Sequence, residues 1–207
     1  MIDYKKKVIF IHVHKVAGQS ITRSIEDNYI PKIFQHNKHL RWNYKKFIIS
    51  DSLITKNNYI NKHSHAKEYK HYLKDEYENF FKFAFVRNPL DWQVSMYFYM
   101  KGVDSHPEHN IVKDMSFSQY INWRCTKELN FQSDYLLDDK NNFLVDFVGK
   151  YENLNKEILF VSKETGLKFD LPHLNKSQHK HFLEYYDNQS KELVYKYFKK
   201  DFDILSY

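Results

Sequence analysis

Two near-continuous apolar runs, each followed by a polar turn, dominate the hydrophobic pattern of this chain. Residues 8–13 (VIFIHV) lead into HKVAGQS, and residues 81–86 (FKFAFV) lead into Arg87-Asn88-Pro89. Runs of this kind are typical of strands that are buried on both faces of a parallel sheet. After the first run, Gly18 permits a tight turn, and Ile21 with Ile25 has the i, i+4 spacing of a packed helix face. The pattern therefore predicts a strand, a turn and a helix in succession.

The same pattern predicts one continuous α/β unit along the rest of the chain. Asn88 as N-cap and Pro89 at the first helical position mark a helix start. The expected strands are 7–13, 47–50, 81–86 and 143–148, and the expected helices are 18–28, 66–77, 89–100, 116–124, 154–165, 177–186 and 190–200. The stretches 29–59 and 103–114 fit neither period and are interpreted as long connections that line an acceptor groove.

Composition limits the size and the partners of the protein. The chain has 207 residues, of which 42% are hydrophobic and 18% aromatic, so we expect one domain over residues 1–207. The net charge of +6 favours anionic ligands, but it is below the density of a dedicated nucleic-acid binder. Nucleic acid is therefore not an expected partner. Composition does not indicate an oligomeric state.

The ends and the cysteine content bear on the cell compartment. The first apolar run begins at residue 8, which leaves no room for a signal-peptide core, and no stretch approaches about 18 apolar residues. Cys125 is the only cysteine, so no intramolecular disulfide can form. We expect a cytoplasmic protein with no membrane span.

The turn after the first strand has the features of an anion site. The first N–H groups of a helix lack intrahelical acceptors and lie at the positive end of the helix dipole, and Lys15 adds a positive charge beside them. The turn is not a Walker A loop, because Lys15 precedes the only glycine and no GKS or GKT follows. An ATP or GTP hydrolase is therefore disfavoured.

Four segments in order resemble one enzyme family. HKVAGQS at 14–20 resembles the 5′-phosphosulfate loop of sulfotransferases that use 3′-phosphoadenosine 5′-phosphosulfate (PAPS), in the carbohydrate-type branch that includes heparan sulfate 2-O-sulfotransferase and its bacterial relatives. FAFVRNPLDWQVS at 83–95, VDFVGKYENL at 145–154 and LPHLNKS at 171–177 resemble the family's later segments. His14, Gln19 and Trp92-Gln93 depart from its usual proline, threonine and arginine, which affects the fine geometry of cofactor binding rather than the reaction class.

The resemblance implies a fold, a donor and an acceptor. The fold is a three-layer α/β arrangement, with a central parallel sheet flanked by helices, of the P-loop nucleotide-kinase-like sulfotransferase type. The donor is PAPS, which leaves adenosine 3′,5′-bisphosphate (PAP), and no metal is required. The acceptor is a hydroxyl group, and we expect it to belong to a carbohydrate.

The resemblance also implies roles for single residues. Lys15 is expected to stabilise the bridging oxygen of the leaving phosphate, since sulfuryl transfer, like phosphoryl transfer, depends on positioning and electrostatics. Arg87 and Ser95 are expected to bind the 3′-phosphate, so that Lys15 and Arg87 contact opposite ends of one nucleotide. The remaining expected cofactor contacts are Val16, Ala17, Gly18, Gln19, Ser20, Ile21, Tyr151, Lys176 and Ser177.

The acceptor hydroxyl needs a general base, and histidine supplies one most readily near neutral pH. His63 and His65 lie just before a predicted helix, where enzymes similar to heparan sulfate 2-O-sulfotransferase carry an H-x-H pair that includes their base. The choice between these two histidines stays open. His12 is expected to pack or hydrogen-bond beneath the loop.

Other classes of protein compete with this interpretation. The pairs His12-x-His14 and His63-x-His65 permit a metal-dependent hydrolase, although no H-E-x-x-H spacing occurs. A glycosyltransferase is disfavoured because the single D-x-D pattern, at 201–203, follows the last predicted helix. A non-enzymatic polyanion-binding module fits the basic charge, but it has no need of Lys15 and Arg87 at the ends of two strands.

Overall fold

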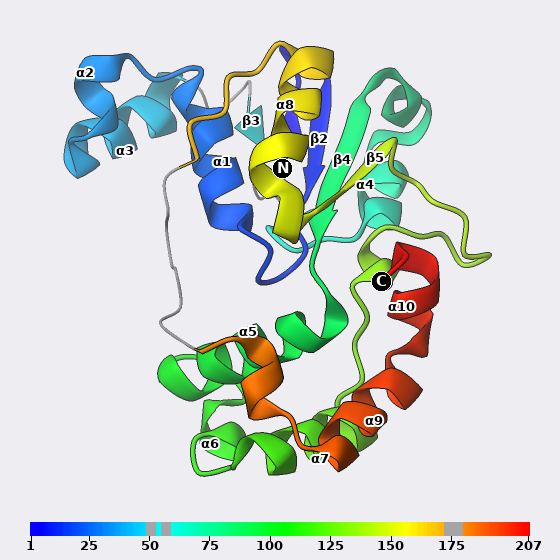
Figure 1. Cartoon of the computed structure of the whole chain (residues 1–207). Helices are drawn as coiled ribbons and strands as arrows, with labels where there is room; N and C mark the ends of the chain where they lie inside the picture. Colours follow the sequence, from blue (N-terminus) through cyan, green and yellow to red (C-terminus); the bar gives the residue numbers. More distant parts are fainter. Residues whose placement is uncertain (49–52, 55–58, 172–179) are drawn as a thin grey trace. The chain divides into compact units, whose positions relative to one another are not determined.

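The computed structural model describes residues 1–48, 53–54, 59–171 and 180–207 of the chain (Figure 1). These residues form two compact units, and each unit combines two separate stretches of sequence. Unit 1 contains residues 1–86 and 135–174, and unit 2 contains residues 87–134 and 175–207. The single domain expected over residues 1–207 stays a prediction.

Unit 1 is built on a mixed sheet. Among the described residues it has five strands in the order β3-β1-β2-β4-β5. β2 pairs in parallel with β4, and β4 pairs in parallel with β5, whereas β1 is antiparallel to both β2 and β3. The strands are β1 (Ile2–Asp3), β2 (Val8–Ile11), β3 (Leu53–Ile54), β4 (Phe81–Val86) and β5 (Phe147–Lys150). The α/β class and the parallel centre are confirmed, and the antiparallel edge is an addition to the prediction.

Two of the expected strands need correction. Phe47 and Ile48 end a helix rather than begin a strand, and residues 49 and 50 lie outside the described part. The strand expected over 143–148 begins only at Phe147 and continues to Lys150. Phe143 instead forms an isolated antiparallel bridge with Leu137.

Both faces of the sheet are covered, as the apolar runs predict. On one face, the Phe85 ring lies against Gly149, and Phe83 meets Phe169 with ring centroids 6.4 Å apart. α8 (Leu154–Thr165) covers this face and crosses in front of the strands in Figure 1. On the other face, the Lys82 ammonium lies 5.2 Å from the ring centroid of Tyr77. Alternate residues of β4 therefore pack into two different layers.

Some of the other helical elements of unit 1 have the bounds expected from the sequence, and others do not. α1 (Gly18–Asp27) has the predicted start, and α4 (Ala66–Leu73) ends before Lys74, whose φ of 52° breaks the helix expected over 66–77. The stretch 29–59, expected to be irregular, contains α2 (Lys32–Gln35) and α3 (Lys38–Ile48). Two 3₁₀ turns complete the unit, η1 (Lys74–Asn79) and η3 (Tyr151–Asn153).

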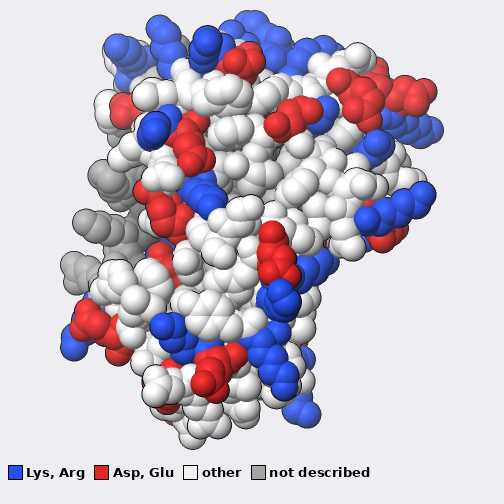
Figure 2. All heavy atoms as spheres, turned by 45° about the vertical axis from the view of Figure 1, so that its right-hand side comes forward, with Lys and Arg blue, Asp and Glu red and all other residues white. Residues whose placement is uncertain are grey.

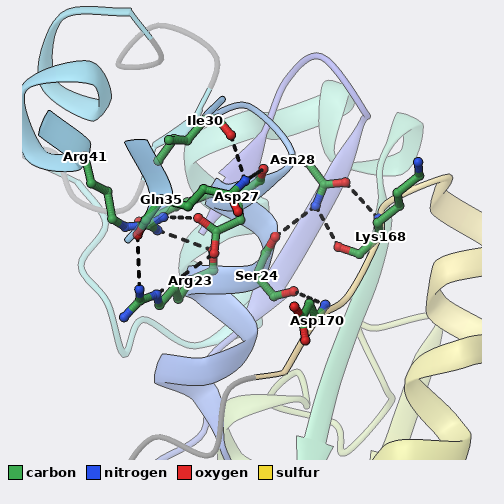
Figure 3. A network of polar contacts seen from close by, with 10 residues as sticks. Arg23, Ser24, Asp27, Asn28, Ile30, Gln35, Arg41, Lys168 and Asp170 are labelled. Atoms are coloured by element: carbon green, nitrogen blue, oxygen red, sulfur yellow. Dashed lines mark hydrogen bonds and ion pairs between the residues drawn. The ribbon is translucent and has the colours of Figure 1, made fainter. Parts of the chain in front are cut away.

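A polar network fastens α2 and α3 to α1 (Figure 3). The Arg41 guanidinium of α3 binds the carboxylates of Asp27 and of Glu26, the latter at 2.8 Å. The Gln35 side chain donates to the backbone carbonyls of Asp27 at 3.0 Å and Ile30 at 2.7 Å. These contacts join the two short helices to α1, and the rings of Phe34 and Tyr44 meet between α2 and α3 with centroids 5.8 Å apart.

The same network joins α1 to the segment that follows α8. The Asn28 side chain donates to the Lys168 carbonyl at 2.8 Å and accepts from the Lys168 N–H at 2.8 Å (Figure 3). The Ser24 hydroxyl accepts from the Asp170 N–H at 2.8 Å. α1 is therefore fixed along its carboxyl-terminal half, away from the loop at its start.

Unit 2 is helical in its described part. It contains α5 (Pro89–Gly102), α6 (His109–Val112), α7 (Phe117–Lys127), η4 (Phe182–Tyr185), α9 (Asn188–Tyr197) and α10 (Lys199–Leu205). The 3₁₀ turn η2 (Ser133–Tyr135) begins in the last two residues of its first stretch. Asn88 caps α5 as predicted, and Ser116 and Asp187 cap α7 and α9. The helix expected over 177–186 is only η4 where it is described, and the one expected over 190–200 divides at Phe198.

A buried carboxylate joins the two stretches of unit 2. Asp201 of α10 is 0% exposed and accepts hydrogen bonds from the backbone N–H groups of Gln132 and Ser133, each at 2.9 Å. Burial raises the pKa of Asp201, and the hydrogen bonds from Ser133 and Gln132 oppose that shift.

No helix within the described ranges is long and apolar enough to cross a membrane. The face drawn in Figure 2 carries basic and acidic side chains interspersed with uncharged surface. Basic side chains lie in a row along the top of this view, and basic and acidic side chains alternate below it.

Candidate functional site

The loop between β2 and α1 carries backbone strain at two positions. Lys15 has a φ of 61° and Ala17 a φ of 62°, both in the left-handed region. This conformation costs about 1–2 kcal/mol for a residue with a side chain, and such strain is concentrated at functional sites. From the sequence, Gly18 was expected to supply the flexible backbone of the turn, but the φ of Gly18 lies outside the left-handed region. That expectation was wrong, because Lys15 and Ala17 adopt the left-handed conformations instead.

The start of α1 has no side-chain cap, in contrast to α5, α7 and α9. Its N-cap residue is Ala17, which has no side-chain acceptor, and its first turn contains no acidic residue. The first backbone bond of the helix runs from the Ile21 N–H to the Ala17 carbonyl at 3.0 Å. The N–H groups ahead of Ile21 precede the intrahelical bonding, so the positive end of this helix suits a bound anion.

Gly18 is required by its neighbour His12. A Cβ atom on Gly18 would fall 1.8 Å from His12 Nε2 and 1.9 Å from its Cδ2, and the three nearest atoms all belong to this ring. His12 is only 4% exposed, and burial lowers its pKa to about 2, with further contributions from His63 and Lys62. Its ring is therefore neutral and lies beneath the loop, which is the position expected from the sequence.

The His63 ring lies beside the same loop in a defined tautomer. Its Nδ1 is 3.0 Å from the backbone carbonyl of His12, which can only accept, so Nδ1 carries the proton and Nε2 keeps its lone pair. The ring stacks on His14 with centroids 3.6 Å apart. Burial lowers the pKa of His63, the hydrogen bond to His12 raises it, and Lys62 and the amino group of Met1 lower it further. A neutral imidazole with an open Nε2 lone pair has the properties of a general base.

His65 lies at the start of α4. Its backbone N–H donates to Glu68 Oε2 at 2.6 Å, and its ring is 4.4 Å from that of Tyr135. Tyr135 also meets the His14 ring at 5.9 Å, so His65 is connected to the histidine cluster through a tyrosine. In the described part of the chain, no group of three or more His, Cys, Asp or Glu side chains is arranged to hold a metal ion.

Arg87 has an internal partner that the sequence analysis did not assign. Its Nε donates to Asp91 Oδ2 at 2.7 Å, its Nη2 donates to Asp91 Oδ1 at 2.9 Å, and the residue is 7% exposed. Gln132 holds the backbone of Arg87 through two hydrogen bonds, at 2.9 and 2.7 Å. Because Asp91 neutralises the guanidinium, the argument that Arg87 needs a ligand phosphate as its partner does not hold. Its binding of a 3′-phosphate stays a prediction from resemblance.

The other expected cofactor residues lie in several elements of the chain. Ser95 is 4% exposed in α5, eight residues after Arg87, and Tyr151 begins η3 directly after β5. Val16 and Ser20 are buried beside the loop, whereas Gln19 is exposed. Lys176 and Ser177 lie outside the described residues.

The comparison with protein families identifies the class. A model described as "Sulfotransferase family" matches residues 1–207, so the chain belongs to the sulfotransferase family. A protein of Archaeoglobus fulgidus described as an uncharacterized protein is 34% identical over 102 residues, which cover 47% of this chain and 78% of that relative. Membership makes this chain a transferase of sulfuryl groups and separates it from the hydrolase alternative.

Proposed function

We propose that this protein transfers a sulfuryl group from PAPS to a hydroxyl group of a carbohydrate, in the cytoplasm and without a metal ion. The observation that carries the proposal is the loop at 12–17, which joins a strained backbone, an uncapped helix start and Lys15 in a chain of the sulfotransferase family. The start of α1 fits an anionic group, because no acidic side chain competes for its first turn.

In this reaction the chain must bind the 5′-phosphate, stabilise the leaving oxygen and accept the proton of the acceptor hydroxyl. The loop N–H groups from Val16 to Ser20 bind the 5′-phosphate, whereas the Ile21 N–H already bonds to the Ala17 carbonyl. The Lys15 ammonium stabilises the negative charge that develops on the bridging oxygen as the sulfur–oxygen bond breaks. His63 Nε2 accepts the proton of the acceptor hydroxyl as its oxygen bonds to sulfur. Nδ1, held by the His12 carbonyl, fixes the ring in the tautomer that can do so.

The remaining assignments come from the family resemblance. Arg87 and Ser95 bind the 3′-phosphate, Tyr151 packs near the adenine, and Lys176 and Ser177 complete the cofactor contacts. In this proposal Asp91 orients the guanidinium rather than competing with the phosphate, because it engages Nε and Nη2 as a fork. His65 is the alternative base.

Titration calorimetry with PAP tests the cofactor assignment without an acceptor. The wild-type chain is expected to bind PAP, and Lys15→Ala and Arg87→Ala should each weaken binding about 10–100-fold, as expected for losing a charged hydrogen bond. Lys163→Ala, an exposed lysine of α8, is the matched control and should leave the affinity unchanged.

Arg87→Lys keeps the charge beside Asp91 if Arg87→Ala does not fold. Absence of PAP binding, or equal affinity in all variants, would remove the cofactor assignment. Sulfuryl transfer to phenols but not to oligosaccharides would leave the donor in place and remove the carbohydrate acceptor.

A further inference from the structure

The His12 side chain lies where β2 meets the loop, and none of the steps proposed above uses it. It is 4% exposed, and its ring stacks on Phe10 with centroids 5.6 Å apart. Its Nδ1 is buried without a hydrogen-bond partner among the described residues. An apolar side chain would fill this space without an unsatisfied nitrogen, so the presence of an imidazole here needs an explanation.

On one side, the His12 ring determines how closely the loop approaches β2. All three atoms nearest to a Cβ on Gly18 belong to this ring, the closest at 1.8 Å. Gly18 is the first residue of α1, so the ring supports the backbone of the helix start where an anion would bind. The contact is steric, because the φ of Gly18 is one that alanine can adopt.

On the other side, His12 contacts the candidate base. The rings of His12 and His63 are 4.6 Å apart at a tilt of 56°, and the His12 carbonyl holds His63 Nδ1. The charged or titratable groups that act on His63 are Lys62, the amino group of Met1 and the imidazoles of His12 and His14. Burial is the largest cause of its lowered pKa, and the His12 ring packs against the His63 ring.

We propose that His12 is a positioning residue for the transfer reaction. Its ring fixes the position of the anion-binding loop through Gly18 and the position of the candidate base, His63. One side chain then fixes the distance between the loop that binds the donor and the base that acts on the acceptor. This inference rests on the proposed function, because it assigns His12 to the same loop and the same base.

A double-mutant cycle on PAP binding tests the loop half of the proposal. Gly18→Ala should weaken PAP binding by about tenfold or more, because the new methyl group displaces either the ring or the loop. His12→Ala removes the ring, so adding Gly18→Ala to that variant should cost less than about threefold. Thermal unfolding of all four chains checks that each is folded, and His12→Asn replaces His12→Ala if the latter is not.

The pH profile of turnover tests the base half. In wild type the acidic limb of kcat/KM should lie below pH 6.5, and His12→Ala should move it upward, because water then reaches His63 and its pKa returns toward the ordinary value. A residue that does not pack against the base would lower the thermal stability and leave the limb where it was. His71→Ala, an exposed histidine of α4, is the control and should not move the limb.

The outcomes separate this inference from the function on which it rests. If the wild-type chain binds PAP but Gly18→Ala weakens that binding equally with and without the His12 ring, the positioning role alone is overturned. An acidic limb that does not move in His12→Ala would have the same meaning. A wild-type chain that does not bind PAP would overturn the proposed function and this role together.

Discussion

His63 can accept a proton only while its ring is neutral, and its surroundings favour that form. Burial lowers its pKa below the ordinary 6.5, so the neutral ring predominates at pH 6.5 and above. We expect kcat/KM to be level near neutral pH and to fall as the pH decreases through the lowered pKa. His63→Ala should reduce kcat about 100-fold or more, since general-base catalysis contributes about 10²–10⁴-fold, and should leave PAP affinity unchanged.

His65→Ala is the comparison that decides between the two candidate bases. If His63 is the base, His65→Ala should keep most of its turnover and the same acidic limb. The reverse result would assign the proton transfer to His65, whose ring lies beside Tyr135. Calorimetry with PAP on both variants separates a loss of chemistry from a loss of binding.

Sequence spacing revealed some of these single-residue features and not others. Arg87 and Asp91 have the i, i+4 spacing of an ion pair, so their contact could have been predicted from the sequence. The family resemblance instead assigned Arg87 to the 3′-phosphate. The contact between His12 and Gly18 could not have been predicted, because it depends on how the loop folds back between them. The left-handed conformations of Lys15 and Ala17 also depend on that fold, since neither residue type favours them.

Short elements of this protein depend on tertiary contacts, and α3 is an example. Arg41 binds Glu26 and Asp27 of α1, and its side chain is 13% exposed. Arg41→Ala should therefore speed amide hydrogen exchange in α2 and α3 by about tenfold or more while changing the global free energy of unfolding much less, because it removes a local anchor. Hydrogen exchange followed by mass spectrometry measures both regions in one experiment.

Lys38→Ala is the matched control for Arg41, because Lys38 is exposed on the same helix. It should leave the exchange of α2 and α3 unchanged. Equal protection of these helices in wild type and Arg41→Ala would show that the network in Figure 3 does not hold them.

Elements with a strong periodic pattern were predicted almost to the residue, and those without one were missed. β4 and α8 have the expected bounds, because a long apolar run and a regular helix face specify them locally. β1 and β3 are two residues long, and such strands exist only through their partners in the sheet. α2 and α3 similarly form where Arg41 and Gln35 meet α1, which no local pattern shows.

Across the whole molecule, each unit is closed by contacts between distant stretches of sequence. In unit 2 the Asp201 carboxylate accepts from two buried backbone N–H groups, those of Gln132 and Ser133. Asp201→Ala leaves both donors without this acceptor, at about 1–3 kcal/mol each. We expect the free energy of unfolding, measured with urea, to fall by about 2–5 kcal/mol.

Asp203→Ala on the same helix is the control for Asp201. The Asp203 side chain is 59% exposed and forms a surface ion pair with Lys199, so its loss should change the unfolding free energy by less than about 1 kcal/mol. Similar effects of the two substitutions would show that Asp201 does not join the two stretches.

The composition and the apolar pattern describe one continuous chain and do not show which stretches associate. Nothing local to residues 87–134 indicates that they associate with 175–207, because Asp201 acts over a sequence separation of 69 residues. β4 and β5 are also far apart in sequence. The apolar pattern could therefore predict that they belong to a parallel sheet, but not which residues pair.

That distant pairing has a consequence during synthesis on the ribosome. β4 pairs with β5 from Phe83↔Phe147 to Val86↔Lys150, so a nascent chain that has reached any point between residues 87 and 146 has no β5 to cover this edge. At ordinary rates of translation the interval lasts on the order of several seconds. An uncovered apolar strand edge recruits strands from other chains. During this interval, newly made copies are therefore more open to association through β4 than the complete chain is.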